Sequence, residues 1–303
     1  MALASWRLPS CWQDRPRNPN STWRARFQQW CFGPPAYREA LRRKLLDINP
    51  FLWLVSRNRL GQVVVWGVLG LIGCGFIFGV SETGLRDSMP WFVVVIVANH
   101  SVLKFWIASE TCTHLEEQRR SGALEFLLSC TPLSVEEITR GQWLALRRRF
   151  LGPLAAVLCF DVVLIVLSQI PYMDNEVEET VHFVAVVVAA MLMLVVDAWA
   201  IGWLGMWRAM AEKRPRQAAG QTVTRILIFP WLVLFLIGMS GMFAFFWETL
   251  ICWFVLGVGV DVAFAGVAKE NLFSQFRARA AVQMEEPLGI LGQLGRMLGR
   301  MGR

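Results

Sequence analysis

The sequence is short of charge for its length. Asp, Glu, Lys and Arg make up 17% of its 303 residues, whereas they make up about 25% of an ordinary soluble domain. Hydrophobic residues reach 55%, and the mean hydropathy is +0.44. Tyrosine is nearly absent, with 2 residues, but the 15 Trp and 20 Phe exclude a disordered chain, because disordered chains are poor in aromatic residues. The composition therefore argues against a water-soluble globular protein.

Several motifs that carry chemistry are also missing. None of the 7 cysteines stands at Cys-x-x-Cys spacing from another, which excludes a zinc ribbon and a thioredoxin-like motif. The phosphate-binding sequence Gly-x-x-x-x-Gly-Lys-[Ser/Thr] does not occur, nor do the hydrolase motifs His-Glu-x-x-His and Gly-x-Ser-x-Gly. We therefore expect no catalytic residue, no metal site and no cofactor in this chain.

What the sequence does contain is a set of long apolar stretches. A hydrocarbon core about 30 Å thick needs about 20 apolar residues in a helix, and in lipid the backbone must satisfy its own hydrogen bonds. We therefore expect an all-α integral membrane protein with six transmembrane helices. The predicted spans are residues 62–80, 91–109, 151–170, 181–206, 226–246 and 249–268.

Positive charge is confined almost entirely to alternate connections between these spans. Of 30 Arg and Lys residues, 28 fall in residues 1–61, 110–150, 207–225 and 269–303, whereas the loop 171–180 has four acids and no base. Connections rich in Arg and Lys stay in the cytoplasm, so we predict an inner-membrane protein with both termini cytoplasmic. The same asymmetry explains the net charge of +7, so no nucleic-acid partner is expected.

The chain is expected to have three parts. They are a cytoplasmic N-terminal segment 1–61, a six-span domain 62–268 and a cytoplasmic tail 269–303. Within the first part, residues 36–48 have the spacing of an amphipathic helix, which Asn49-Pro50 ends. The apolar run Phe51–Val55 that follows suits either a helix lying in the membrane interface or an ordinary linker.

The connection 110–150 is longer than a minimal loop, and it carries six acids and six bases. Residues 115–129 favour a helix, and Thr131-Pro132 stops it. Ser134 then starts a second helix with a capping box, because Glu137 lies three residues later. This second helix should run into the third span, so we predict a helical hairpin that projects from the membrane. Periodicity leaves open whether the hairpin binds a soluble partner or packs on its own bundle.

Residues 117–141, EQRRSGALEFLLSCTPLSVEEITRG, carry a recognisable pattern. The segment resembles the loop after the second span in type-2 ATP-binding-cassette (ABC) exporter permeases, where charged residues precede Gly-Thr-Leu-Glu, Leu-Leu, Thr-Pro-Leu-Ser and Glu-Ile before Gly-Lys. In this sequence Ala123 replaces the common Thr and Gln142 the common Lys. The matching positions are Gly122, Leu124, Glu125, Leu127, Leu128, Thr131, Pro132, Leu133, Ser134, Glu137, Ile138 and Gly141.

The resemblance implies a fold and a role. Such permeases have six helices per subunit and work as dimers, so a second permease subunit, identical or different, is implied. Residues 122–128 would form a coupling helix that binds a separate ATP-binding-cassette ATPase subunit, which would hold ATP and Mg²⁺. Residues 51–58 would be the interface helix before the first span. The residues implied in coupling are Gly122, Leu124, Glu125, Leu127, Leu128, Thr131, Pro132 and Glu137.

Ionisable residues also fall inside the predicted spans. They are His100, Lys104, Asp161, Asp197 and Asp261. Because charge is costly in lipid, each should face protein or water. Depth from the inner ends of the spans allows Lys104 to pair with Asp197 or Asp261. The five residues either line the path of a cargo or form internal ion pairs that fix helix packing.

The expected function is therefore that of the transmembrane permease subunit of an ATP-driven exporter, with lipid bilayer, ATPase subunit and second permease subunit as partners. Two alternatives stay open. One is a stand-alone, proton-linked secondary transporter that uses intramembrane Asp and His. The other is a membrane anchor that transports nothing. The sequence does not specify the cargo.

Overall fold

The computed structural model describes residues 35–56, 60–84, 89–169, 177–212, 215–228 and 246–280. Within these ranges the regular structure is helical, without strands. The chain separates into two compact units, Met1–Val64 and Val65–Arg303. These helices confirm the expectation of an all-α membrane protein, because five of them are long and apolar enough to cross a membrane.

The first unit contains α3 (Pro35–Leu46) and α4 (Pro50–Val55), which contact each other. Asn49 starts α4, because its side-chain oxygen accepts hydrogen bonds from the backbone N–H groups of Phe51 (2.8 Å) and Leu52 (3.1 Å). Pro50 fits the first position of the helix, where no N–H donor is needed. The predicted helix at 36–48 is present as α3, and the break at Asn49-Pro50 is present as well. Within the predicted segment 51–58 the chain is helical as far as Val55, and residues 57–59 lie outside the described residues.

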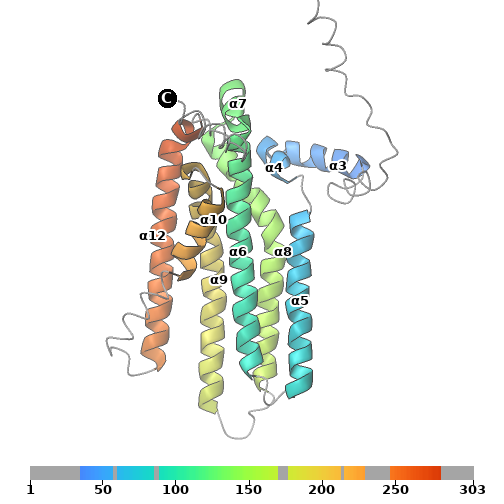
Figure 1. The fold of residues 1–303 in the computed structure, drawn as a ribbon, viewed down its shortest axis with the longest axis vertical. Helices are drawn as coiled ribbons and strands as arrows, with labels where there is room; N and C mark the ends of the chain where they lie inside the picture. The colour runs from blue at the N-terminus through green and yellow to red at the C-terminus, as the bar shows by residue number, and fades with distance from the viewer. Residues whose placement is uncertain are drawn as a thin grey trace, which may run out of the picture. The chain divides into compact units, whose positions relative to one another are not determined.

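The second unit is built from long helices (Figure 1). Five helices in the described part of the chain are long and apolar enough to cross a membrane. They are α5 (Leu60–Thr83, which begins in the first unit), α6 (Met89–Arg120), α8 (Val135–Gln169), α9 (Val177–Ala211) and α12 (Phe246–Ala280). The protein is accordingly a multi-pass membrane protein. Most of the predicted fifth span, 226–246, lies outside the described residues.

The spanning helices are longer than the predicted spans. α6 continues eleven residues beyond 109, and α8 begins at Val135, so the predicted second leg of the hairpin and the third span are one helix. This helix contains Pro153, which a membrane helix tolerates where its neighbours satisfy the freed backbone group. The largest extensions, those of α6, α8 and α12, lie at the end of the bundle that carries α7 (Ala123–Cys130), which we call the hairpin end (Figure 1).

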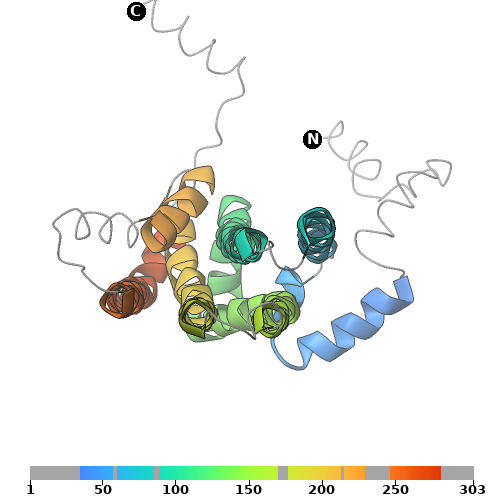
Figure 2. The same cartoon turned by 90° about the horizontal axis from the view of Figure 1, so that it is seen from below.

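α9 is the central helix of the packing. It packs against both α6 and α12, and α8 packs against α6 and α9. Seen end-on, α9 lies between α12 and α8 (Figure 2). A shorter pair, α10 (Pro215–Val223) and the π-helix η1 (Thr224–Ile228), lies against α6 and α9 near the hairpin end. The core between these helices is apolar, and includes Leu103, Leu194 and Leu204.

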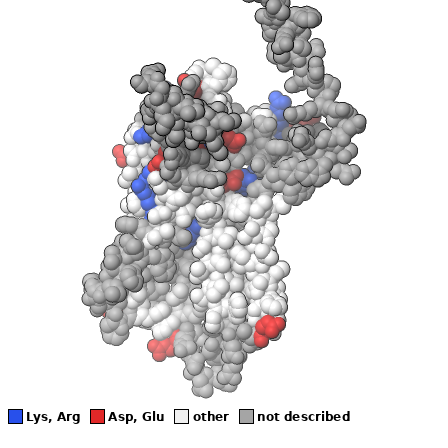
Figure 3. Space-filling model, in the orientation of Figure 1, with Lys and Arg blue, Asp and Glu red and all other residues white. Residues whose placement is uncertain are grey.

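The outer face of the bundle is apolar as well. Large side chains such as Leu71 of α5 and Val255 of α12 are exposed, which is the distribution expected where lipid, not water, surrounds the helices. In Figure 3 most of the blue Lys and Arg residues of the bundle lie toward the hairpin end, where red acidic residues are seen as well, and the charged residues seen at the opposite end are red. Exposed Glu82 and Glu178 mark that opposite end.

One predicted helix is wrong. Residues 115–129 do not form a single helix, because α6 ends at Arg120 and α7 begins at Ala123. Gly122 separates them with a φ of 70°, in the left-handed region that glycine adopts without a steric penalty. The left-handed conformation of Gly122 ends α6 and makes α7 a separate, short helix at the tip of the hairpin (Figure 1).

Candidate functional site

α7 has one buried side and one exposed side. Leu124 has 0% of its surface exposed, whereas Phe126, two residues later, is 65% exposed. Two positions on a helix are separated by about 200° of rotation, so the two side chains point in opposite directions. Leu124 therefore holds α7 on the bundle, and Phe126 is the large apolar group that α7 presents outward.

The segment after α7 is fixed by local hydrogen bonds. The Thr131 backbone N–H donates to the Leu127 carbonyl at 3.1 Å, and the Thr131 hydroxyl donates to the same oxygen. Ser134 and Glu137 form a reciprocal capping box, in which the Ser134 N–H donates to Glu137 Oε2 (2.8 Å) and the Glu137 N–H donates to Ser134 Oγ (3.2 Å). α7 and the start of α8 are thus joined by an ordered connection.

The residues that the resemblance implies in coupling are distributed around this hairpin. Leu124 is buried, so it cannot itself contact a separate protein while α7 is seated. The half-buried members are Gly122, Glu125, Leu127, Leu128 and Thr131, and the exposed members are Pro132 and Glu137. Phe126 is missing from the predicted set, although its spacing from Leu124 was a signal that it lies on the opposite face.

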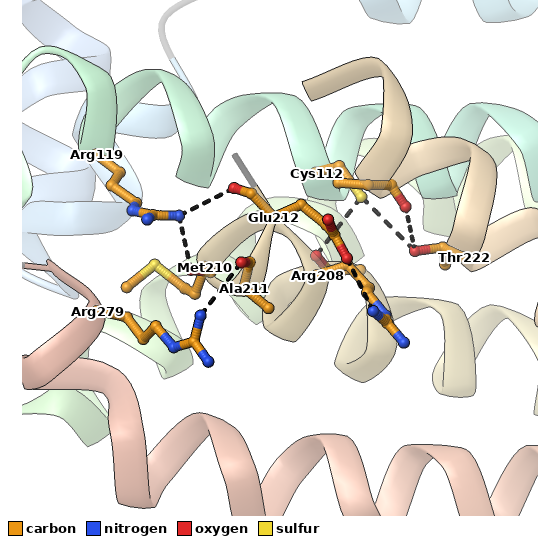
Figure 4. Close-up of polar contacts among 10 residues, drawn as sticks. Cys112, Arg119, Arg208, Met210, Ala211, Glu212, Thr222 and Arg279 are labelled. Carbon is orange, nitrogen blue, oxygen red and sulfur yellow. Dashed lines mark hydrogen bonds and ion pairs between the residues drawn. The ribbon is translucent and has the colours of Figure 1, made fainter. Parts of the chain in front are cut away.

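Below α7, two arginines close the end of α9 (Figure 4). Arg119 of α6 donates from Nη1 to the backbone carbonyls of Met210 (2.6 Å) and Glu212 (3.2 Å). Arg279 of α12 donates from Nη1 to the carbonyl of Ala211 (3.2 Å). The last carbonyls of a helix lack partners within the helix and carry partial negative charge. The two guanidinium groups therefore stabilise this end and join α6, α9 and α12.

The thiol of Cys112 connects α10 to α6 and α9 near the same end of α9. Cys112 of α6 donates to the Gly205 carbonyl of α9 (Sγ to O, 3.5 Å), and its sulfur lies 3.8 Å from Thr222 Oγ1 of α10 (Figure 4). The Thr222 hydroxyl in turn donates to the Ala218 carbonyl (2.8 Å). Gly205 permits this close approach, since a Cβ there would lie 2.9 Å from the side chain of Thr111. α10 is therefore held at the same level as the two arginines. We call the side chains of Cys112, Arg119, Thr222 and Arg279 the polar layer.

The two legs of the hairpin are tied by a charged cluster. Glu110 of α6 forms an ion pair with Arg149 of α8, and the His114 ring lies against both side chains, with Nε2 3.0 Å from Arg149 Nη1. The three side chains are between 11% and 16% exposed. Such partly buried ion pairs are screened less by salt than surface pairs. The cluster therefore fixes the spacing of α6 and α8 just below α7.

The ionisable residues predicted inside the spans come together. His100 Nε2 lies 2.8 Å from Asp161 Oδ2, joining α6 to α8. Lys104, one turn further along α6, forms an ion pair with Asp197 of α9. Of the two acids that depth offered to Lys104, Asp197 is the one that forms the pair. Asp261 of α12 is buried and interacts with both Asp197 and Lys104.

This arrangement places two basic residues on α6 opposite one acid from each of three other helices. An unpaired charge at the centre of a membrane helix costs about 3 kcal/mol on insertion scales, and pairing offsets this cost. Four of the five residues, in two pairs, therefore have the contacts of internal packing groups. Within the described residues, no three His, Cys, Asp or Glu side chains converge as metal ligands.

The chain has no detected relative that would assign these residues a role. No family model matches the sequence, and neither the curated proteins nor the solved structures yielded a match. A function is therefore inferred from the hairpin, the polar layer below it and the intramembrane charges.

Proposed function

We propose that this chain is the membrane-spanning permease subunit of an ATP-driven ABC exporter. Its partner is a separate ATP-binding subunit that holds ATP and Mg²⁺, and both termini and the hairpin lie in the cytoplasm. One observation carries the proposal: α7 is a short helix, set off by Gly122, with Leu124 buried in the bundle and Phe126 exposed. The resemblance of residues 117–141 to the coupling loop of such permeases gives the same assignment.

The contacts of α7 provide a way to transmit its movement. α7 follows α6 after a two-residue turn, leads into α8 and contacts α12. Arg119, three residues before Gly122, is bonded to the end of α9. A partner that displaces α7 would therefore act on four of the spanning helices at once. Such movement is what alternating exposure of a cargo path requires.

Phe126 is the residue on which recognition would depend. Large aromatic residues that insert into a partner's pocket contribute most of the energy at many protein interfaces. Phe126 is exposed at the tip of the described hairpin, and Glu125 beside it is half-buried. A groove in the ATP-binding subunit with an apolar centre would receive Phe126. The cargo path would lie between this permease and a second, identical or different, permease subunit.

The proposal is tested by purifying the affinity-tagged chain from its native membranes and placing it in lipid vesicles. We expect an ATP-binding-cassette subunit to co-purify and to hydrolyse ATP. Phe126→Ser should lose that subunit while the chain stays in the membrane, whereas the neighbouring exposed Cys130→Ser should retain it. The absence of such a subunit from the wild-type preparation would overturn the proposal, as would unchanged binding and hydrolysis with Phe126→Ser.

A proton-linked secondary transporter is the second candidate, and the intramembrane acids favour it. His100, Asp161, Asp197 and Asp261 provide groups that can take up protons within the bundle. This candidate requires transport in vesicles that contain the chain alone and a proton gradient. The same vesicles therefore separate the two functions.

A further inference from the structure

Asp261 is a buried acid for which the described residues provide no base of its own. Its side chain is in the middle of α12, with 0% of its surface exposed. Among the described residues, neither of its carboxyl oxygens has a hydrogen-bond donor as partner. Its interactions are with the carboxyl group of Asp197 and, through charge, with Lys104. One lysine therefore has to balance the charge of two buried carboxyl groups.

The register of α9 and α12 explains why the two acids meet. Both helices run toward the hairpin end, and Gly257 of α12 packs against Met193 of α9, where a Cβ on the glycine would collide with the methionine side chain. Asp261 and Asp197 each lie four residues, about one turn, after this contact. The missing side chain at Gly257 lets the helices approach closely at the level of the acids.

Among the helices that the structure describes, none provides a second cation to Asp261. On α6, Lys104 is paired with Asp197 and His100 with Asp161 of α8. On η1, the Arg225 guanidinium lies 5.6 Å from the ring centre of Phe264 of α12, and its charge interactions are with Arg208 and Glu212. These are the charged and titratable groups that the packed helices bring near Asp261.

The two buried carboxyl groups and Lys104 therefore need one further positive charge to be neutral together. If both carboxyl groups were ionised, the cluster of Lys104, Asp197 and Asp261 would carry a net charge of −1. A buried charge without a partner is strongly unfavourable, and two adjacent carboxylates relieve their repulsion by holding one proton between them. A metal ion is the weaker solution, because hard cations take six or more oxygen ligands and no three-ligand group converges in the described residues.

We propose that Asp197 and Asp261 bind one proton between them, so that the cluster they form with Lys104 is neutral in the membrane interior. The proton converts one acceptor into a donor and lets the two carboxyl groups hydrogen bond to each other across the α9–α12 contact. Because Asp261 has no exposed surface, the proton exchanges with solvent only when α12 separates from α9. This site does not depend on the proposed partner or on ATP.

The test is infrared spectroscopy of the purified full-length chain in lipid nanodiscs at neutral pH, with carbon-13-labelled aspartate. The wild type should show the C=O stretch of a protonated carboxyl group, shifted by the label. Asp261→Asn should lose this component, because Asp197 then pairs with Lys104 as an ion. The matched control is Asp47→Asn, which removes an exposed aspartate of the first unit and should leave the component unchanged.

A second variant keeps the test decisive if Asp261→Asn does not fold. Lys104→Met removes the only base of the cluster, so both carboxyl groups should be protonated and the component should increase. A wild-type spectrum without a protonated carboxyl group would overturn the proposal. So would a component that persists in Asp261→Asn, or one that does not rise in Lys104→Met. Neither ATP nor a partner takes part, so failure here leaves the proposed function untouched.

Discussion

Arg119 of α6 donates a hydrogen bond of 2.6 Å to the backbone carbonyl of Met210, 91 positions later in the chain. The arginine lies three residues before Gly122, at the base of the hairpin, and the carbonyl is one of the last in α9. Arg119 therefore joins the hairpin directly to the central helix of the bundle. This bond adds to the contacts of α7 with α6 and α12 and to the burial of Leu124.

Replacing Arg119 with alanine should destabilise the protein. Hydrogen bonds from a charged group contribute about 1.5–3 kcal/mol, and the carbonyls at the end of α9 would lose this donor in a buried place. We expect a loss of about 2 kcal/mol in the free energy of unfolding, measured in detergent. Arg120→Ala is the matched control, since Arg120 is exposed, and its effect should stay within about 0.5 kcal/mol. Equal effects of the two variants would refute the link.

Gly122 should not tolerate a side chain, for reasons of backbone geometry alone. A Cβ at Gly122 would meet nothing within 4 Å, but φ is +70°, and this region costs other residues about 1–2 kcal/mol. Gly122→Ala should therefore lower the free energy of unfolding by about 1 kcal/mol. Gly220→Ala is the control, because Gly220 is equally open but lies in α10 without a positive φ. There, alanine should stabilise the helix by about 0.5–1 kcal/mol.

Much of the helical architecture could be predicted from the sequence, because about 20 apolar residues in a row favour one structure in lipid. The ends of the helices could not, since α6 continues past Ser109 through polar residues that are buried only by tertiary contacts. Thr111 and Cys112 are examples, as both are buried against α9. The break at Gly122 was visible as a glycine within a helical pattern, yet the helix propensity on either side outweighed it in the prediction.

The partners within the membrane were harder to predict than the residues themselves. Depth along the spans placed Lys104 at the level of Asp197 and so predicted that these two residues could pair. It did not predict the pairing of His100 with Asp161, because hydropathy does not fix the rotation of α8 about its axis. The hydrogen bond from Arg119 to Met210 could not be predicted from the sequence, because its acceptor is a backbone carbonyl, which every residue has.

The two sides of α7 should differ in what they contribute to folding. Leu124→Ala removes a fully buried side chain and leaves a cavity, which costs about 3 kcal/mol. Phe126→Ala removes a side chain that is 65% exposed, so the free energy of unfolding should change by about 0.5 kcal/mol or less. Thermal unfolding of both variants in detergent measures the difference. A large loss for Phe126→Ala would place Phe126 in the fold and remove it as the docking residue.

The cluster around Lys104 should respond unequally to loss of its members. Lys104→Met leaves Asp197 and Asp261 without a base, and breaking a buried pair in this way costs about 3 kcal/mol or more. Asp197→Asn should cost less than half as much, because Asp261 already interacts with Lys104 and can replace Asp197 as its partner.

The double variant should be no less stable than Lys104→Met alone, since the asparagine then removes one of two acids that have lost their base. Unfolding in detergent gives all three free energies, and a coupling of about 1–3 kcal/mol between the two sites is expected. If the two single losses were equal and simply added in the double variant, Asp261 would have no part in balancing the charge of Lys104.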